Sequence, residues 1–231
     1  MIIYSHEKFE GVYWCELDDG TQRLATINLT PGFKVYGEQL LKYGETEYRL
    51  WNAYRSKLAA SIMKGIHTIT IKPDINILYL GAATGTTVSH VSDIIGSNGR
   101  VYAVEFAPRV FRELITVCER RKNIVPILAD ARLPESYRMF VPAVDSIYSD
   151  VAQPEQAKLL VDNAKMFLKS DGEIMLAIKA RSVDVTLEPS EIYKREIDYL
   201  TNNGFQILAV VHLEPYDKAH AMVLAKYVEG E

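Results

Sequence analysis

Four ionisable side chains in this sequence are of types that can move or hold a proton: Lys57, Asp150, Lys179 and His220. Lysine and histidine act as general acids or bases, and a carboxylate can orient a cation beside it. A hydroxyl group is a weak nucleophile, so it needs such help before it can attack another centre. We expect the four residues to form a site that prepares a hydroxyl group for a transfer reaction.

The four side chains have different expected roles. A lysine has a pKa of ~10.4 and is protonated near neutral pH. A second lysine, a positively charged co-reactant and partial burial would each lower that pKa, whereas Asp150 would oppose the change. We expect Lys179 to take or guide the hydroxyl proton and Asp150 to orient it. Lys57 and His220 would position the acceptor or its phosphate. A lone lysine or histidine is more often a surface residue, so these roles depend on the fold.

A run of small residues interrupts the stretch "NILYLGAATGTTVSHV" at residues 76–91. It departs from the dinucleotide pattern G-x-G-x-x-G, because Ala82 and Ala83 follow Gly81 and the next glycine is Gly85. It also lacks the lysine of a phosphate-binding loop. Gly81 and Gly85 would let the backbone approach a ligand at the end of a strand, and Thr86 and Thr87 would offer donors at the start of a helix. The stretch is therefore either a ligand cradle without a phosphate site or only a tight turn.

Acidic residues follow the next two apolar runs. Glu105 lies 24 positions after Gly81, where an acidic side chain often binds a ribose, and Asp130 ends the run "ILAD". Carboxylates at both places suit a ligand with a ribose, an amine and a positive centre, as in S-adenosylmethionine. The alternative is that Glu105 and Asp130 only cap the helices that follow.

The order of elements explains how these residues would meet. Apolar runs alternate with segments of helical spacing such as "RVFRELITVCERR" and "EQAKLLVDNAKMFLK", which indicates a parallel sheet with helices on both faces. Only "EPYDKA" separates the last two runs, which is too short for a parallel crossover, so the last strand should be antiparallel. Its first residue, His220, would then lie at the same sheet edge as Asp150 and Lys179. The seven apolar runs are "NILYLG", "RVYAVEF", "NIVPILAD", "VDSIYSDV", "GEIMLAIKA", "FQILAVVHL" and "HAMVLAKYV".

The N-terminal part has a different pattern. Asp19 and Gly20 separate two segments rich in strand-forming residues, which is a hairpin signal. Residues 55–66 have apolar residues at four-residue spacing and should form a helix. We therefore predict a β-rich unit over residues 1–52 and a Rossmann-like α/β domain over residues 53–231.

Composition restricts the function classes further. The 231 residues carry a formal charge of −4, so any nucleic-acid binding must depend on local basic residues or on a partner. Arg55 and Arg181 are the RNA-contact candidates, because they stand beside the candidate catalytic segments. The two cysteines are far apart and predict buried, idle thiols and no metal site. No apolar run is long enough to span a membrane, and no signal peptide is visible, so we expect a soluble intracellular protein.

Long motifs in this chain closely resemble fibrillarin over nearly its whole length. They are "VYGEQLLKYGETEYRLWNAYRSKLAASI", "YLGAATGTTVSHVSDIIG", "VEFAPRV", "ILADAR", "DVAQPEQA", "IKARSVDVT" and "EPYDKAHAMV". The resemblance implies an S-adenosylmethionine-dependent methyltransferase with a seven-stranded, mostly parallel sheet and an antiparallel last strand. It implies methylation of ribose 2′-hydroxyls on rRNA, with tRNA as a further substrate, within a box C/D guide RNA particle.

The resemblance also assigns site residues. The family's catalytic set falls on Lys57, Asp150, Lys179 and His220. One departure concerns Ala219, which stands where family members often have an acidic residue before the histidine. The implied cofactor contacts are Thr86, Thr87, Glu105, Phe106, Asp130, Ala131, Asp150 and Gln153, in addition to Gly81 and Ala82.

Partners and location are likewise implied by the resemblance alone. The expected partners are a Nop-domain scaffold protein, a kink-turn-binding ribosomal-type protein, a box C/D guide RNA and the target rRNA. Recognition by a guide RNA would explain why the chain is not basic. The sequence has no Gly/Arg-rich extension, so it resembles the archaeal form and is expected in the cytoplasm.

Other functions stay open from sequence. The same cofactor site could serve a protein methyltransferase acting on glutamine, or a subunit that binds the cofactor without turnover. A dehydrogenase is a more distant alternative, because the small-residue run does not match a pyrophosphate site. The target nucleotides and the identity of the general base are not determined by the sequence.

Overall fold

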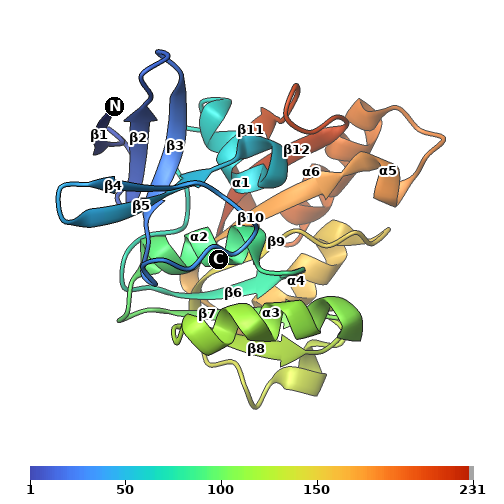
Figure 1. Ribbon diagram of the computed structural model, residues 1–231. Coiled ribbons are helices and arrows are strands. Elements are labelled where there is room, and N and C mark those ends of the chain that lie inside the picture. The colour runs from blue at the N-terminus through green and yellow to red at the C-terminus, as the bar shows by residue number, and fades with distance from the viewer. Residues whose placement is uncertain (229–231) are drawn as a thin grey trace.

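A five-stranded antiparallel sheet forms the N-terminal part of the chain (Figure 1). The computed structural model describes residues 1–228. The predicted hairpin at Asp19 and Gly20 joins β2 to β3, and a second hairpin joins β4 to β5. The strands, in the spatial order β1-β2-β3-β5-β4, are β1 (Ile2–Ser5), β2 (Val12–Glu16), β3 (Gln22–Ile27), β5 (Thr46–Trp51) and β4 (Leu40–Tyr43).

The second sheet has seven strands, as the sequence predicts. β6 to β10 pair in parallel, and β12 pairs antiparallel with both β10 and β11. The predicted antiparallel last strand is therefore confirmed, and it inserts between β10 and β11. In spatial order the strands are β11 (Phe205–His212), β12 (His220–Tyr227), β10 (Leu168–Lys179), β9 (Val144–Ser149), β6 (Asn76–Leu80), β7 (Arg100–Glu105) and β8 (Ile124–Leu128).

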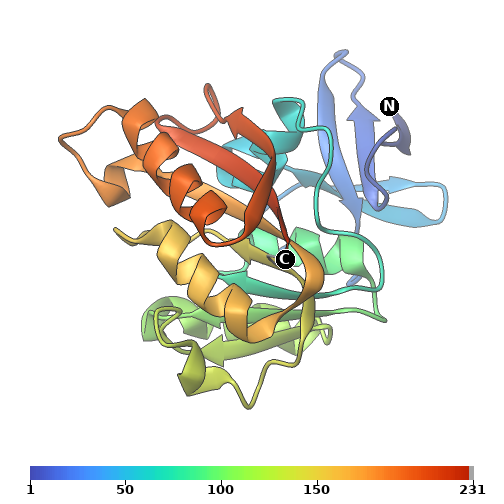
Figure 2. The same cartoon turned by 180° about the vertical axis from the view of Figure 1, so that it is seen from behind.

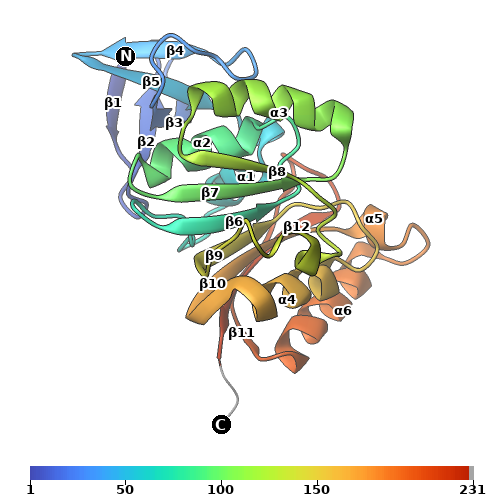
Figure 3. The same cartoon turned by 90° about the horizontal axis from the view of Figure 1, so that it is seen from below.

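Helices cover both faces of this sheet, with α2 and α3 on one side and α4 and α6 on the other (Figures 2 and 3). The helices predicted in "RVFRELITVCERR" and "EQAKLLVDNAKMFLK" are α3 and α4. The helical elements are η1 (Ala53–Arg55), α1 (Lys57–Met63), α2 (Thr86–Ile95), α3 (Pro108–Arg120), η2 (Pro134–Tyr137), α4 (Gln156–Phe167), α5 (Ala180–Val183) and α6 (Pro189–Asn202).

The helix predicted over residues 55–66 is shorter than expected. Ser56 has extended backbone angles and caps α1, because its Oγ accepts a hydrogen bond from the Ala59 N–H at 3.3 Å. At the other end, Gly65 has a φ of 83°, which a right-handed helix does not allow. The cap fixes Lys57 as the first residue of α1.

Strand β6 shows why its residues are almost all apolar. Ile77 and Tyr79 pack on the side of α1, α2 and α3, whereas Leu78 and Leu80 pack on the side of α4 and α6. A parallel strand buried on both faces needs such a continuous apolar run. Trp51 of β5 belongs to the same core as Ile77, Tyr79 and the apolar residues of α1, α2 and α3. The small sheet therefore packs against the helices on that face of the large sheet.

A buried polar network joins the small sheet to α2. The Arg49 guanidinium donates to Glu38 and to Asp93, each at 2.7 Å, and Asp93 also pairs with the buried Arg121. His90 lies 2.8 Å from the Thr26 hydroxyl. The last residue of β5, and so of the small sheet, is Trp51. The division into domains 1–52 and 53–231 stays a prediction. The last three residues of the second predicted domain, 229–231, lie outside the described residues.

Both cysteines are buried and free, as predicted, and burial raises the pKa of the Cys118 thiol to about 12. Within residues 1–228 no helix has the length and apolar character to cross a membrane. The same residues contain no cluster of three or more histidine, cysteine or acidic side chains arranged to hold a metal.

Candidate active site

The candidate catalytic residues meet at one edge of the seven-stranded sheet. Lys179, the last residue of β10, is the register partner of His220, the first residue of β12. Asp150 follows β9, and its N–H donates to the Leu80 carbonyl of the neighbouring strand at 2.9 Å. The sheet topology therefore brings together residues that are up to 70 positions apart in the sequence.

One carboxylate oxygen holds both lysines. The Oδ1 atom of Asp150 lies 3.2 Å from Lys57 Nζ and 2.9 Å from Lys179 Nζ. Lys179 Nζ also donates to the main-chain carbonyl of Asp150 at 2.6 Å. The three side chains are only 15–19% exposed, so the ion pairs are weakly screened by water. Lys57 and Lys179 are thereby fixed on the two sides of Asp150.

Asp217 connects His220 to this cluster, and the sequence analysis did not select it. Its Oδ2 lies 3.5 Å from Lys57 Nζ, and its Oδ1 lies 3.0 Å from His220 Nδ1. The signal was its place in "EPYDKAHAMV", three residues before His220. Ala219 has a φ of 56° and no acidic side chain, so the acidic partner of the histidine is Asp217.

The histidine tautomer follows from these contacts. His220 Nδ1 lies 2.7 Å from the Lys218 carbonyl oxygen as well as 3.0 Å from the Asp217 carboxylate. Both neighbours are acceptors, so Nδ1 carries a hydrogen and donates it. In the neutral ring Nε2 is then the acceptor.

Lys57 is held in its charged form. Burial lowers the pKa of Lys57, but the carboxylates of Asp150 and Asp217 outweigh burial and raise it above its ordinary value. For Lys57 the carboxylates prevail over burial, because two anions face its ammonium group. The side chain acts as a fixed cation.

The small-residue run brings two strand ends close together. Gly81 has a φ of 81°, and a Cβ at this position would lie 2.9 Å from the Asp150 carbonyl oxygen. The glycine is required by the backbone conformation and by this close contact. Helix α2 then begins at Thr86, and Thr87 Oγ1 donates to Ser56 Oγ at 3.0 Å, which ties α2 to the start of α1.

Backbone amides or a neighbouring arginine orient the two predicted acidic residues. The Glu105 carboxylate accepts from the Ala83 and Ala107 N–H groups, both at 2.8 Å. Arg132 bonds Asp130 and holds the pKa of that carboxyl below its usual value. Ala107 is the N-cap residue of α3, and α3 has no side-chain cap hydrogen bond, so the capping role that was the alternative from sequence is not seen for Glu105.

Two hollows meet at the catalytic cluster. We name them after the ligands expected from the sequence: the cofactor hollow, of about 250 Å³, and the acceptor hollow, of about 400 Å³. Gly81, Ala83, Asp150 and Lys179 line both. The predicted cofactor residues in the cofactor hollow are Gly81, Glu105, Phe106, Asp130, Ala131, Asp150 and Gln153. Those in the acceptor hollow are Gly81, Ala82, Thr86, Thr87 and Asp150, so Ala82, Thr86 and Thr87 are predicted cofactor contacts that do not line the cofactor hollow.

The two arginines predicted to contact RNA lie in different surroundings. Arg55 lines the acceptor hollow, lies 5.1 Å from the centre of the Tyr36 ring and donates to the Tyr36 carbonyl. Arg181 donates to the Val185 carbonyl at 2.9 Å and lines neither hollow. Of these two arginines, Arg55 is the one that lines the acceptor hollow.

Comparison with known proteins gives a consistent family. The family model described as Fibrillarin matches residues 3–229. A fibrillarin-like rRNA/tRNA 2′-O-methyltransferase of Staphylothermus marinus is 60% identical over 225 residues, which cover 97% of this chain and 96% of the relative.

Solved structures agree in sequence and in fold. Aeropyrum pernix fibrillarin, crystallised with natively bound S-adenosyl-L-methionine, is 57% identical with a TM-score of 0.92, over 97% of this chain and 98% of the other. A fibrillarin from a fibrillarin/Nop5p complex is 40% identical with a TM-score of 0.83, over 93% and 97%. With this sheet topology, this sheet-edge cluster and these matches along its length, the chain belongs to the fibrillarin family.

Proposed function

We propose that this chain is an S-adenosylmethionine-dependent 2′-O-methyltransferase that acts on the ribose of rRNA and tRNA within a box C/D guide RNA particle. The observation that carries the proposal is the position of Asp150 and Lys179 in the wall shared by the two hollows. Groups that handle a hydroxyl proton thereby lie between a site for a methyl donor and a site for an acceptor. The activity named for the Staphylothermus relative supports this assignment.

The cofactor hollow fits this methyl donor chemically. Glu105, Asp130 and Asp150 line it, and such carboxylates suit ribose hydroxyls, an amine and a positive sulfur. The loop from Gly81 to the start of α2 has no lysine or arginine, which makes it a poor site for a pyrophosphate. S-adenosylmethionine bound to the Aeropyrum fibrillarin supports the same choice. When bound, the cofactor supplies a methyl group made electrophilic by its sulfonium.

The residues of the chain then have distinct roles. An ammonium group has three N–H donors, and Asp150 engages Lys179 through its carboxylate and its carbonyl, which leaves a donor position for the acceptor hydroxyl. In its neutral form Lys179 would take the hydroxyl proton on its nitrogen lone pair, and in its ammonium form it would guide that proton by donating to the acceptor oxygen. Lys57, with its raised pKa, stays a cation and holds the acceptor oxygen or its phosphate. His220, through its Nε2 atom, would likewise position the acceptor or its phosphate.

Partners supply the sequence specificity in this proposal. A chain with a formal charge of −4 lacks the general attraction to polyanions that nonspecific RNA binders have. A Nop-domain scaffold would hold it on the particle, as the fibrillarin/Nop5p complex supports. We further propose a kink-turn-binding protein, a box C/D guide RNA and target rRNA as the other partners, and the cytoplasm as the location, on the archaeal-type resemblance.

A reconstitution tests the proposal. The chain is incubated with labelled cofactor, scaffold, kink-turn-binding protein, guide RNA and target RNA, and each component is omitted in turn. We expect label on the target RNA only with the complete particle. Label on a glutamine side chain would identify a protein methyltransferase, and cofactor binding with no transfer would identify a non-catalytic subunit. Either of these results would overturn the proposed activity.

A further inference from the structure

A third hollow, of about 360 Å³, adjoins the acceptor hollow, and Arg55 lines both. Two cations line the third hollow, Lys34 and Arg55, together with one acidic residue, Glu113. We call it the basic hollow. Its lining residues are Phe33, Lys34, Val35, Tyr36, Arg55, Thr84, Glu113, Thr116 and Val117.

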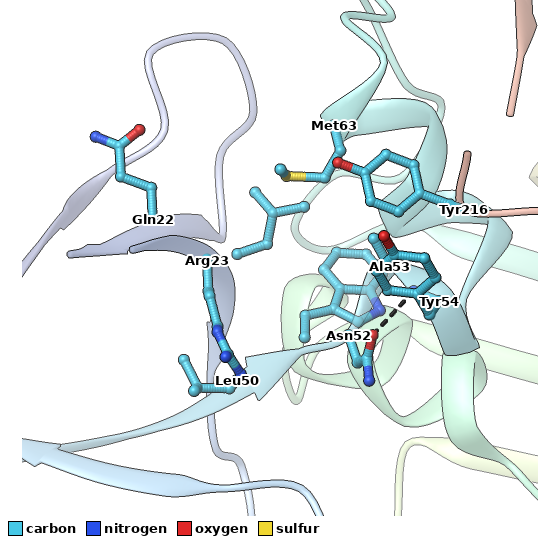
Figure 4. Close-up of a pocket in the computed structure, with 10 residues that line it drawn as sticks. Gln22, Arg23, Leu50, Asn52, Ala53, Tyr54, Met63 and Tyr216 are labelled. Atoms are coloured by element: carbon cyan, nitrogen blue, oxygen red, sulfur yellow. Dashed lines mark hydrogen bonds between the residues drawn. The ribbon is translucent and has the colours of Figure 1, made fainter. Parts of the chain in front are cut away.

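The residue of η1 that precedes Arg55 lines a hollow of a different kind (Figure 4). There the Tyr54 ring packs against the Tyr216 ring, with their centres 5.0 Å apart. Arg23 is the only charged side chain that lines this hollow within residues 1–228. Tyr54 and Arg55 both line the acceptor hollow as well, so η1 adjoins the acceptor hollow, the aromatic hollow of Figure 4 and the basic hollow.

Buried groups hold the segment that carries Lys34. The Glu38 carboxylate accepts from the N–H groups of Val35, at 3.1 Å, and Tyr36, at 2.8 Å. The Tyr36 hydroxyl lies 2.7 Å from His90 Nε2 of α2. This wall of the basic hollow is therefore anchored by the protein itself and does not need a ligand to form it.

The same segment orients Arg55. Its guanidinium lies 5.1 Å from the centre of the Tyr36 ring, and Nη1 donates to the Tyr36 carbonyl at 3.3 Å. A guanidinium has five N–H donors, so this contact leaves donors for a ligand. Neither Arg55 nor Lys34 forms an ion pair with another residue in the range 1–228. Both charges are therefore available to an anion.

A phosphodiester matches these groups. Arginine binds phosphate oxygens through parallel hydrogen bonds, and lysine binds them as a point charge. When a target strand is paired with a guide RNA, its bases are engaged, whereas its phosphates and ribose hydroxyls remain accessible. Each ribose has a phosphate on either side, so a ribose in the acceptor hollow brings a phosphate of the same strand close to Arg55.

We propose that the basic hollow holds a phosphodiester of the target strand next to the acceptor ribose. Arg55 donates to its oxygens, and Lys34 supplies a second positive charge. This inference rests on the proposed function and names the part of the RNA that the chain itself binds. A phosphate contact carries no sequence information, so it serves every target that a guide RNA selects. Lys179 and Asp150 act on the hydroxyl while these two cations hold the strand.

The test removes one charge at a time from the RNA and from the protein. In separate target RNAs, an uncharged amide linkage replaces the phosphodiester on either side of the target ribose, and the Kd and KM of each RNA are measured with the complete particle. With the wild-type chain, one of the two linkages should weaken binding about five- to fiftyfold. In Arg55→Ala and Lys34→Ala, unmodified RNA should bind more weakly, and the same linkage should cost much less than in wild type.

Two further variants complete the design. Glu113→Gln removes a negative charge from the basic hollow and should lower the Kd for unmodified RNA about two- to fivefold. Lys42→Ala removes an exposed cation of β4 that lines none of the four hollows, and it should leave Kd and KM unchanged. All four substituted side chains are exposed, so folding should be unaffected.

Each contrary result has a distinct meaning. An amide linkage that costs the same in wild type, Arg55→Ala and Lys34→Ala would overturn the inference and leave the proposed function intact. Weaker scaffold binding by Arg55→Ala, with the linkage costs unchanged, would identify the basic hollow as a protein contact and also overturn it. If the variants reduce the linkage cost as expected but no ribose is methylated, the phosphate contact stands and the proposed function is contradicted instead.

Discussion

At the scale of single residues, Asp150 determines how the two lysines lie. Its carboxylate binds both ammonium groups, and its carbonyl binds Lys179 a second time. Such a partly buried cluster of ion pairs keeps each side chain in one geometry, because moving one cation leaves the carboxylate with an unbalanced charge. The consequence is a preset arrangement that does not need the substrate to assemble it.

Much of this cluster was predictable from sequence. Asp150, Lys179 and His220 end or begin apolar runs, so a topology argument could place them at one sheet edge. Asp217 was not found in this way, because it lies in a turn whose path no periodicity describes. The raised pKa of Lys57 depends on Asp150 and also on Asp217, so its direction could not be worked out from the predicted residues alone. Such pairings come from side-chain geometry rather than from the order of elements.

Replacing Lys179 tests its assigned role. We predict that Lys179→Ala lowers kcat for methyl transfer about 10²- to 10⁴-fold, the usual effect of losing a general acid or base. Its affinity for the cofactor should not fall, because three carboxylates still line that hollow. Single-turnover kinetics and calorimetric cofactor titration measure the two quantities. Lys64→Ala, at the exposed end of α1, is the control, and full activity in Lys179→Ala would remove this residue from the mechanism.

At the scale of elements, the meeting of β6 and β9 positions the site. Gly81 allows the end of β6 to approach the Asp150 carbonyl, and Asp150 is the residue that holds the lysines. These strands could be predicted from the sequence, because a strand buried on both faces needs a continuous run of apolar residues. The hairpin of β4 and β5 gave a weaker signal, since β4 has no buried residue.

Two glycines allow this contact to be measured. Gly81 and Gly32 have nearly the same φ, 81° and 82°, but a Cβ at Gly32 would meet nothing within 4 Å. Left-handed backbone costs an alanine about 1–2 kcal/mol, so Gly32→Ala should lose that amount of unfolding free energy. Gly81→Ala should lose about 1–3 kcal/mol more, from the clash with Asp150. Urea unfolding compares them, and equal losses would show that the contact does not constrain position 81.

At the scale of the whole molecule, buried polar groups hold the small sheet on the large domain. His90 of α2 lies between the Thr26 and Tyr36 hydroxyls, at 2.8 and 2.7 Å, and stacks on Trp51. Burial first, and then the charges of Arg49 and Arg121, lower the pKa of His90 well below its ordinary value of 6.5. The folded protein therefore keeps His90 neutral. This network was not predictable, because it joins residues from separate segments without a sequence pattern.

The neutral histidine makes stability depend on pH. Above pH 6.5 the contribution of His90 is complete; below it the unfolded chain takes up a proton that folded His90 does not bind, so stability falls. One such proton changes the unfolding free energy by about 1.4 kcal/mol per pH unit. We predict that urea unfolding of the wild-type chain shows this loss of unfolding free energy between pH 6 and 5. In His90→Gln, the slope of unfolding free energy against pH should be smaller by the same amount. Equal slopes would show that His90 is not held neutral.

For the molecule as a whole, we propose that a ribose 2′-hydroxyl accepts the methyl group. The most direct measurement compares labelled methyl transfer to two target RNAs in the reconstituted particle, identical except for a 2′-deoxy sugar at the target nucleotide. We predict full labelling of the ribose target and none of the deoxy target, because the deoxy sugar has no oxygen for Lys179 and Asp150 to prepare. Equal labelling of both RNAs would place the methyl on a base or a protein and contradict the account.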